Sequence, residues 1–193
     1  MDDGVPGRLG RSTTIALTGI GLGALVGGVG GRIAMSLLAR SSPEAHGTAT
    51  DDGFVMGRVT LSGTLELILI ATVLGLIGAG IYAGVRWLHF PGLAARIVVT
   101  AACAGVGVGA ILVHRDGVDF TLLDAPLAIA LFVAIPALYG GLLAWVVETR
   151  APLRPGRARH GSFVALRWVG RAVAASAFLV LVRDLVLDTV ALT

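Results

Sequence analysis

Five long apolar segments alternate with short polar stretches along the chain, at about 13–38, 64–85, 95–113, 122–147 and 163–182. Each contains close to the ~20 apolar residues that cross the ~30 Å hydrocarbon core of a membrane. Such segments must be helical, because unpaired backbone groups find no water in lipid. The pattern therefore predicts an all-α integral membrane protein, a polytopic bundle of about five transmembrane helices. We expect residues 1–193 to form a single transmembrane domain, with an outer loop over 39–63 and a basic cytoplasmic loop over 148–162.

The amino-acid composition agrees with this pattern. Hydrophobic residues make up 55% of the chain and charged residues 14%, with 28 Gly and a mean hydropathy of +0.87. A soluble domain carries about 25% charged residues, so these values argue against both a disordered chain and a water-soluble globule. All 15 basic residues are Arg, and the sequence contains no Lys, Asn or Gln. Because that usage is typical of a GC-rich bacterial genome, we expect a bacterial plasma (inner) membrane protein.

The distribution of Arg predicts the orientation. If every apolar segment crosses the membrane once, the N-terminus and the 86–96 and 148–162 stretches share one side. That side holds eight Arg and the opposite side five: Arg8, Arg11, Arg86, Arg96, Arg150, Arg154, Arg157 and Arg159 against Arg32, Arg40, Arg58, Arg115 and Arg183. Arg accumulates in cytoplasmic loops. We therefore expect a cytoplasmic N-terminus and an extracytoplasmic C-terminus.

Glycines recur at helical spacing within the segments. Gly19, Gly23, Gly27 and Gly31 follow one another every four residues along the first segment, and Gly105 and Gly109 repeat this spacing in the third. Residues four apart share a helix face, and a face of glycines allows close approach by another helix. Two interpretations follow: tight packing inside one bundle, or a seam between copies of the chain.

A faint internal repeat relates the first two segments to the next two. Glu66 and Tyr82 in the second segment correspond to Asp124 and Tyr139 in the fourth, at offsets of 58 and 57 residues. Both hairpins run in the same direction, so the pattern predicts a parallel repeat of the kind found in some transporters.

Carboxylates gather in the two predicted outer loops. Asp51 and Asp52 lie in the long first loop, and Asp116 and Asp119 lie in the short second loop. Four carboxylates at one mouth of the bundle can bind a divalent cation through oxygen. The alternative is that they are solvated, or paired with Arg32, Arg58 and Arg115.

Two further acids, Glu66 and Asp124, stand near the starts of predicted spans. Thr121 to Asp124 has the spacing of a capping box, with the acid at the third helical position. A carboxylate there also complements the helix dipole. The alternative function is a membrane-facing acid pair that handles protons or cations.

Three Arg interrupt apolar segments. Arg167 and Arg171 share one helix face, and Arg171 would lie roughly 13 Å inside a span that began at Phe163. An Arg at the centre of the bilayer costs roughly 2.5–3.5 kcal/mol, so both are expected either at the lipid headgroups or against a partner, for which Glu148 is available. They would then form an anion site or an interhelical clasp. Arg32 presents the same alternatives at the outer end of the first segment.

Signatures of known chemistry are missing from the sequence. It contains no HExxH, Walker A or Gly-x-Ser-x-Gly pattern, and its four His fall in different loops, so we expect no cofactor and no confident metal or catalytic site. The pI near 10.0 reflects membrane topology. No aromatic platform accompanies the basic 150–160 stretch, so we expect no nucleic acid as a partner.

Two functions fit this sequence best. The first is a non-enzymatic accessory or scaffold subunit that packs through its Gly-rich faces with itself or with a partner membrane protein. The second is a small transporter or channel for a cation, proton or small solute that uses the acids Glu66 and Asp124. A membrane enzyme built on the outer acids is a third interpretation. Membrane lipid is an expected partner in every case.

Overall fold

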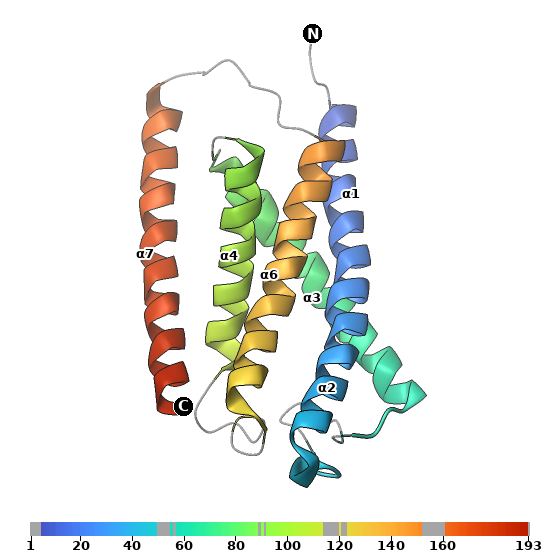
Figure 1. The fold of residues 1–193 in the computed structure, drawn as a ribbon. Helices are drawn as coiled ribbons and strands as arrows, with labels where there is room; N and C mark the ends of the chain where they lie inside the picture. Colours follow the sequence, from blue (N-terminus) through green and yellow to red (C-terminus); the bar gives the residue numbers. More distant parts are fainter. Residues whose placement is uncertain are drawn as a thin grey trace.

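Long helices account for almost all of the residues that the structure describes. The computed structural model describes residues 5–49, 55, 57–88, 90, 92–113, 120, 123–151 and 161–192 (Figure 1). The elements are, in order, α1 (Val5–Leu22), η1 (Gly23–Val29), α2 (Gly30–Ser41), η2 (Pro43–Ala45), α3 (Leu61–Trp87), α4 (Leu93–Leu112), α6 (Ala125–Arg150) and α7 (Gly161–Leu192). In these ranges β-pairing amounts to one isolated bridge, between Ala49 and Val55. The predicted all-α polytopic bundle is confirmed.

Four helical stretches in the described residues are long and apolar enough to cross a membrane: Gly10–Ser41, Leu61–Trp87, Leu93–Leu112 and Ala125–Arg150. They contain nearly all of the first four predicted spans. The fifth predicted span, 163–182, lies within α7, which continues to Leu192. It carries five charged residues, Arg167, Arg171, Arg183, Asp184 and Asp188.

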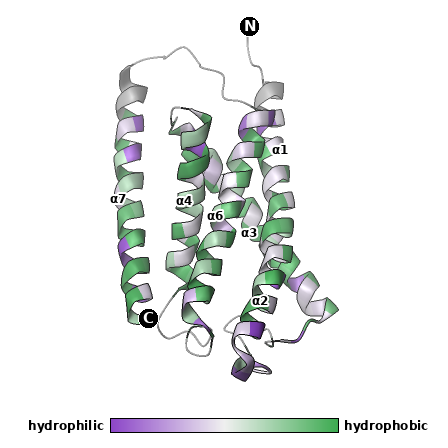
Figure 2. Cartoon of the chain, in the orientation of Figure 1, coloured by the Kyte–Doolittle hydropathy of each residue, from purple (hydrophilic) through white to green (hydrophobic). Residues whose placement is uncertain are grey.

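The outward faces of the helices are apolar. Leu65, Leu69 and Ile81 of α3 are 58%, 66% and 63% exposed, and hydrophobic residues dominate the helices between their ends (Figure 2). A soluble protein rarely exposes contiguous apolar patches of this extent, whereas lipid tails cover them without cost. The chain is therefore a multi-pass membrane protein.

Each helix has a preferred neighbour. α4 packs chiefly on α6, while α1 and η1 pack on α3, and α1 also contacts α6. α7 lies at the edge of the bundle and packs on α4 (Figure 1). Two buried clusters fill the ends of the bundle, one around Ala79, Tyr82 and Leu143, and the other around Val113 and Ala128.

The first membrane span is one helical path with a π-helical stretch, η1, between α1 and α2. Its sequence, GALVGGV, contains three glycines. Glycine tolerates the wider π turn because it has no side chain to pack, and such turns occur mostly as short insertions within α-helices. The stretch lies where the first span comes closest to α3.

The regularly spaced glycines pack inside the chain. A Cβ atom built on Gly19 would lie 2.7 Å from the carbonyl oxygen of Gly75, and one built on Gly23 would lie 2.9 Å from the Cα of Gly75. Real Cβ atoms essentially never come within 3.0 Å of such neighbours. Gly27 and Gly31 face α3 as well, and Gly105 and Gly109 face α6. Because α3 occupies the face formed by Gly19, Gly23 and Gly27, this face is not open to a second copy of the chain.

The loop after α2 folds back onto the bundle. Ala45 in η2 is buried in the cluster with Val113 and Ala128. The Ser42 hydroxyl accepts a hydrogen bond of 2.9 Å from the backbone N–H of Asp124, which joins this loop to the start of α6. The carboxylates Asp51, Asp52, Asp116 and Asp119, and with them the predicted cation site, lie outside the described residues.

Asp124 caps α6 in a different way from the predicted one. Its carboxylate accepts a hydrogen bond of 3.2 Å from the N–H of Leu127, and α6 begins at Ala125. Asp124 is therefore the N-cap residue itself and not the third residue of a capping box. The helix begins later than the capping-box spacing predicts, and Pro126 is favoured in its first turn.

Candidate functional site

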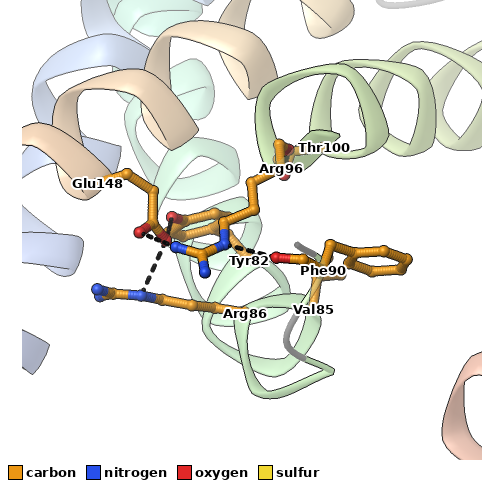
Figure 3. A pocket seen from close by; sticks show the side chains of 7 residues that line it. All are labelled: Tyr82, Val85, Arg86, Phe90, Arg96, Thr100 and Glu148. Carbon is orange, nitrogen blue, oxygen red and sulfur yellow. Dashed lines mark hydrogen bonds and ion pairs between the residues drawn. The ribbon is translucent and has the colours of Figure 1, made fainter. Parts of the chain in front are cut away.

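A buried carboxylate, Glu148, lies at the end of the bundle where α3 and α6 finish and where α4 and α7 begin. We call this the Arg-rich end. Glu148 stands in the last turns of α6 and is only 6% exposed. Its Oε1 accepts a hydrogen bond of 2.8 Å from the Tyr82 hydroxyl and lies 3.0 Å from the Nε of Arg86. Its Oε2 lies 2.7 Å from the Nη1 of Arg96 (Figure 3). Both carboxylate oxygens are therefore paired.

Local structure explains why these side chains meet. Tyr82 and Arg86 are four residues apart on α3, so both point from the same face toward α6. Arg96 lies at the end of the first turn of α4. The three helices thus contribute one charged group each to a site at their common end, together with one phenol from α3.

The two arginines also hold the ends of the helices. Arg86 donates through Nη2 to the carbonyl oxygen of Ala151, the C-cap of α6. A cation is favourable at this position, because the last carbonyls of a helix carry a partial negative charge. Arg96 donates through Nε to the carbonyl oxygen of Phe90 at 2.9 Å, and so fixes the connection between α3 and α4.

The cluster carries an excess of positive charge. Two guanidinium groups, Arg86 and Arg96, face one carboxylate, Glu148, which gives a net charge of +1 in a site where the side chains of Arg86 and Glu148 are 7% and 2% exposed. A buried ion pair must recover a large desolvation cost, which requires close contacts and filled hydrogen bonds. The three partners of Glu148 meet that requirement for the acid. They leave one cation without a matching acid in the cluster.

Arg171 joins α7 to the same end of the bundle. Its Nε donates to the carbonyl oxygen of Leu88 at 3.0 Å, and its guanidinium carbon lies 5.5 Å from the ring centre of Phe90 and 5.1 Å from that of Trp168. Arg171 is thus level with the C-cap of α3 and acts as an interhelical clasp. Glu148, the acid available to Arg171 in the sequence, is paired with Arg86 and Arg96.

A small pocket opens beside the cluster. Figure 3 shows its lining side chains, which come from α3, α4, α6 and the α3–α4 connection: Tyr82, Val85, Arg86, Phe90, Arg96, Thr100 and Glu148. Its wall therefore combines cations and one acid with apolar and aromatic surface. Phe90 is shared between this pocket and Arg171, so the guanidinium groups of Arg96 and Arg171 flank the same residue.

A second tyrosine also joins α3 and α6, but its hydroxyl donates in the opposite direction, from α6 to α3. Tyr139 of α6 donates its hydroxyl to the carbonyl oxygen of Gly75 on α3, whereas Tyr82 of α3 donates to Glu148 on α6. These two residues are the ones that the sequence repeat paired. The repeat itself stays a prediction.

The remaining predicted site residues do not belong to this cluster. Arg32 lies on α2, with its Nη1 3.8 Å from the sulfur of Met35, and Arg58 is exposed in the segment before α3. Glu66 is exposed in the second turn of α3, and Asp124 caps α6. Arg167 lies on α7 one turn before Arg171. In the part of the chain that the structure describes, no group of three or more His, Cys, Asp or Glu could hold a metal ion.

Tyr82, Arg86 and Arg96 were not singled out from the sequence as a site. One signal was present: apart from Asp2 and Asp3, Glu148 is the only acid among the segments predicted to be cytoplasmic. A lone acid among many Arg next to apolar spans favours an ion pair. Comparison with protein families, with curated proteins and with solved structures gives no match to this chain.

Proposed function

We propose that this chain is a non-enzymatic accessory or scaffold subunit of a bacterial inner membrane, which acts by packing against another membrane protein. The observation that carries the proposal is the pairing of Glu148. Its carboxylate is held by Tyr82, Arg86 and Arg96 at 2.7–3.0 Å. An acid that is buried and paired through both oxygens stabilises a helix junction, which favours a structural role for Glu148.

The contacts of Asp124 and Glu66 support the same proposal. Asp124, one of the two acids expected to handle ions, binds the first turn of α6. Glu66 stands on the exposed surface of α3. These positions favour structural and surface roles over a transport pathway.

The surface that fits a partner helix is the middle of α7. Residues 172–177, Ala-Val-Ala-Ala-Ser-Ala, are all exposed, and six consecutive residues go more than once around a helix. α7 contacts the bundle on either side of this stretch, through Gly170 near Leu88 and through Leu185 near Gly109. Small residues are enriched where membrane helices meet, because they permit close backbone approach. Since the glycine face of the first span is filled by α3, this stretch of α7 takes its place as the proposed contact.

The distribution of charge supports the cytoplasmic placement of the N-terminus. Among described side chains, the Arg-rich end holds Glu148 as its acid and six Arg: Arg11, Arg86, Arg96, Arg150, Arg167 and Arg171. Arg on short connections favours the cytoplasmic side. The Arg-rich end, and with it the N-terminus, is accordingly proposed to face the cytoplasm.

Photocrosslinking in intact cells tests the proposed contact. A crosslinking amino acid replaces Ala175 in the small-residue stretch or, as a control, Leu74 on the lipid-facing side of α3, which is 60% exposed. We expect a discrete adduct with a second membrane protein from position 175 and none from position 74. Equal crosslinking at the two positions would contradict a specific contact.

Flux measurements separate this proposal from the transporter alternative. Purified protein in liposomes is expected to conduct neither protons nor common cations. If wild-type flux were found, and were lost in Glu66→Gln and Asp124→Asn, the chain would be a transporter and the scaffold proposal would fail.

A further inference from the structure

The pocket beside Glu148 has the charge of an anion site. Arg86 and Arg96 contribute two positive charges and Glu148 one negative charge. Cations held among membrane helices are costly unless they are paired. Among the described side chains, the cluster therefore has a net charge of +1 that a bound anion would offset.

The donors that would hold an anion are present at the mouth of the pocket. The side chain of Arg96 is 22% exposed, and its bonds to Phe90 and Glu148 use two of the five N–H groups of a guanidinium. α4 begins three residues earlier, at Leu93, and its N-cap Gly92 supplies no side-chain hydrogen bond to the first turn. Backbone N–H groups at a helix start and the helix dipole both favour negative charge.

The surroundings of these donors suit a lipid. The pocket is lined by the apolar Val85 and Phe90 as well as by the arginines, and Trp168, which packs on Arg171 at the same end of the bundle, is 64% exposed. Tryptophan is enriched at membrane–water interfaces, and basic pockets between membrane helices bind anionic headgroups. A phosphodiester with one net charge matches the arginines, while its acyl chains match the apolar flanks.

We infer that the mouth of this small pocket, formed by Arg96 with Arg86, Glu148 and Phe90, binds the phosphodiester headgroup of an anionic phospholipid. The bound lipid neutralises the excess charge of the cluster and lies against the junction of α3, α4 and α6. This inference is independent of the partner contact on α7. It would hold for a transporter as well.

Thermal unfolding of delipidated, detergent-solubilised full-length protein tests the site. The probes are phosphatidylglycerol, phosphatidylcholine and inorganic phosphate, each titrated separately. We expect phosphatidylglycerol to raise the Tm in a saturable way, and the other two to have little effect. Arg96→Gln should weaken the apparent affinity for phosphatidylglycerol roughly tenfold or more, since it removes a charge-assisted contact. The matched control is Arg183→Gln, an exposed Arg in the second half of α7, which should bind as the wild type does.

Glu148→Gln separates binding from a merely structural role. This variant starts from a lower Tm, but it raises the local charge by one unit, so phosphatidylglycerol should stabilise it more than it stabilises the wild type. If the cluster were purely structural, phosphatidylglycerol would raise the Tm of both Arg96→Gln and Glu148→Gln less than it raises the Tm of the wild type. That result would overturn the inference. It would also be overturned by an equal response to phosphatidylcholine or inorganic phosphate, by no wild-type response, or by an equal loss in Arg183→Gln.

Discussion

Gly23 and Gly75 lie so close that a Cβ atom on Gly75 would come within 2.7 Å of the Cα of Gly23. This contact is the crossing point of the first span and α3. It lies within the π-helical stretch η1, where the backbone of the first span is widest. Backbone-to-backbone approach of this kind gains van der Waals contact without burying polar groups, which is how membrane helices associate.

A methyl group at this crossing should separate the two helices. In Gly75→Ala the added carbon meets the backbone of Gly23, which cannot rotate away as a side chain would. We expect destabilisation of about 1–3 kcal/mol, the usual cost of overpacking a close-packed interior. The measurement is the Tm of purified protein in mild detergent.

The matched control is Gly80→Ala on the same helix. A Cβ atom at Gly80 would meet nothing within 4 Å, and Ala is a better helix former than Gly by up to about 1 kcal/mol. Gly80→Ala should therefore keep or raise the Tm. Equal changes in Tm for Gly75→Ala and Gly80→Ala would show that the crossing of the first span and α3 is not tightly packed in solution.

Removing the negative charge of Glu148 should destabilise the protein more than removing the Tyr82 hydroxyl that binds this carboxylate. Glu148→Gln leaves the buried Arg86 and the part-buried Arg96 without their acid, and breaking one side of a buried ion pair costs about 3–5 kcal/mol in soluble proteins. Tyr82→Phe removes one hydrogen bond to a charged group, worth about 1.5–3 kcal/mol. The Tm values of the two variants, measured by thermal unfolding, show which substitution destabilises the protein more. A Glu148→Gln variant as stable as the wild type would mean that the cluster does not hold the helices together.

Substitution of Asp124 tests whether this acid works as a helix cap. Asp124→Ala should destabilise the protein by about 1 kcal/mol, whereas Asp124→Asn should be nearly neutral, because Asn caps helices as well as Asp does. Glu66→Gln serves as the comparison at an exposed acid and should leave the Tm unchanged. If Asp124→Asn were as damaging as Asp124→Ala, the negative charge and not the cap geometry would be what matters.

The sequence predicted the helices well because hydropathy is a local property: about 20 apolar residues require a helix in lipid, whatever they pack against. It also predicted that the face of Gly19 and Gly23 would be packed closely, since their spacing is local. It could not say that α3 is the neighbour. The Glu148 cluster was missed for the same reason, because it joins residues 52 to 66 positions apart. Such pairs form only where particular helix ends meet. The spacing of residues within a segment does not show which ends are neighbours.

The attachment of α7 should depend on the shape of the Arg171 side chain and not on its charge alone. A lysine at this position keeps the charge but loses both the planar stacking on Phe90 and Trp168 and the directed Nε–H bond to Leu88. In Arg171→Lys we therefore expect faster hydrogen exchange in the first half of α7, with little change in α3 or α6. Arg183→Lys, at an exposed site on the same helix, should exchange as the wild type does. Unchanged protection in Arg171→Lys would mean that α7 is held by its apolar contacts with α4, and that the clasp contributes little.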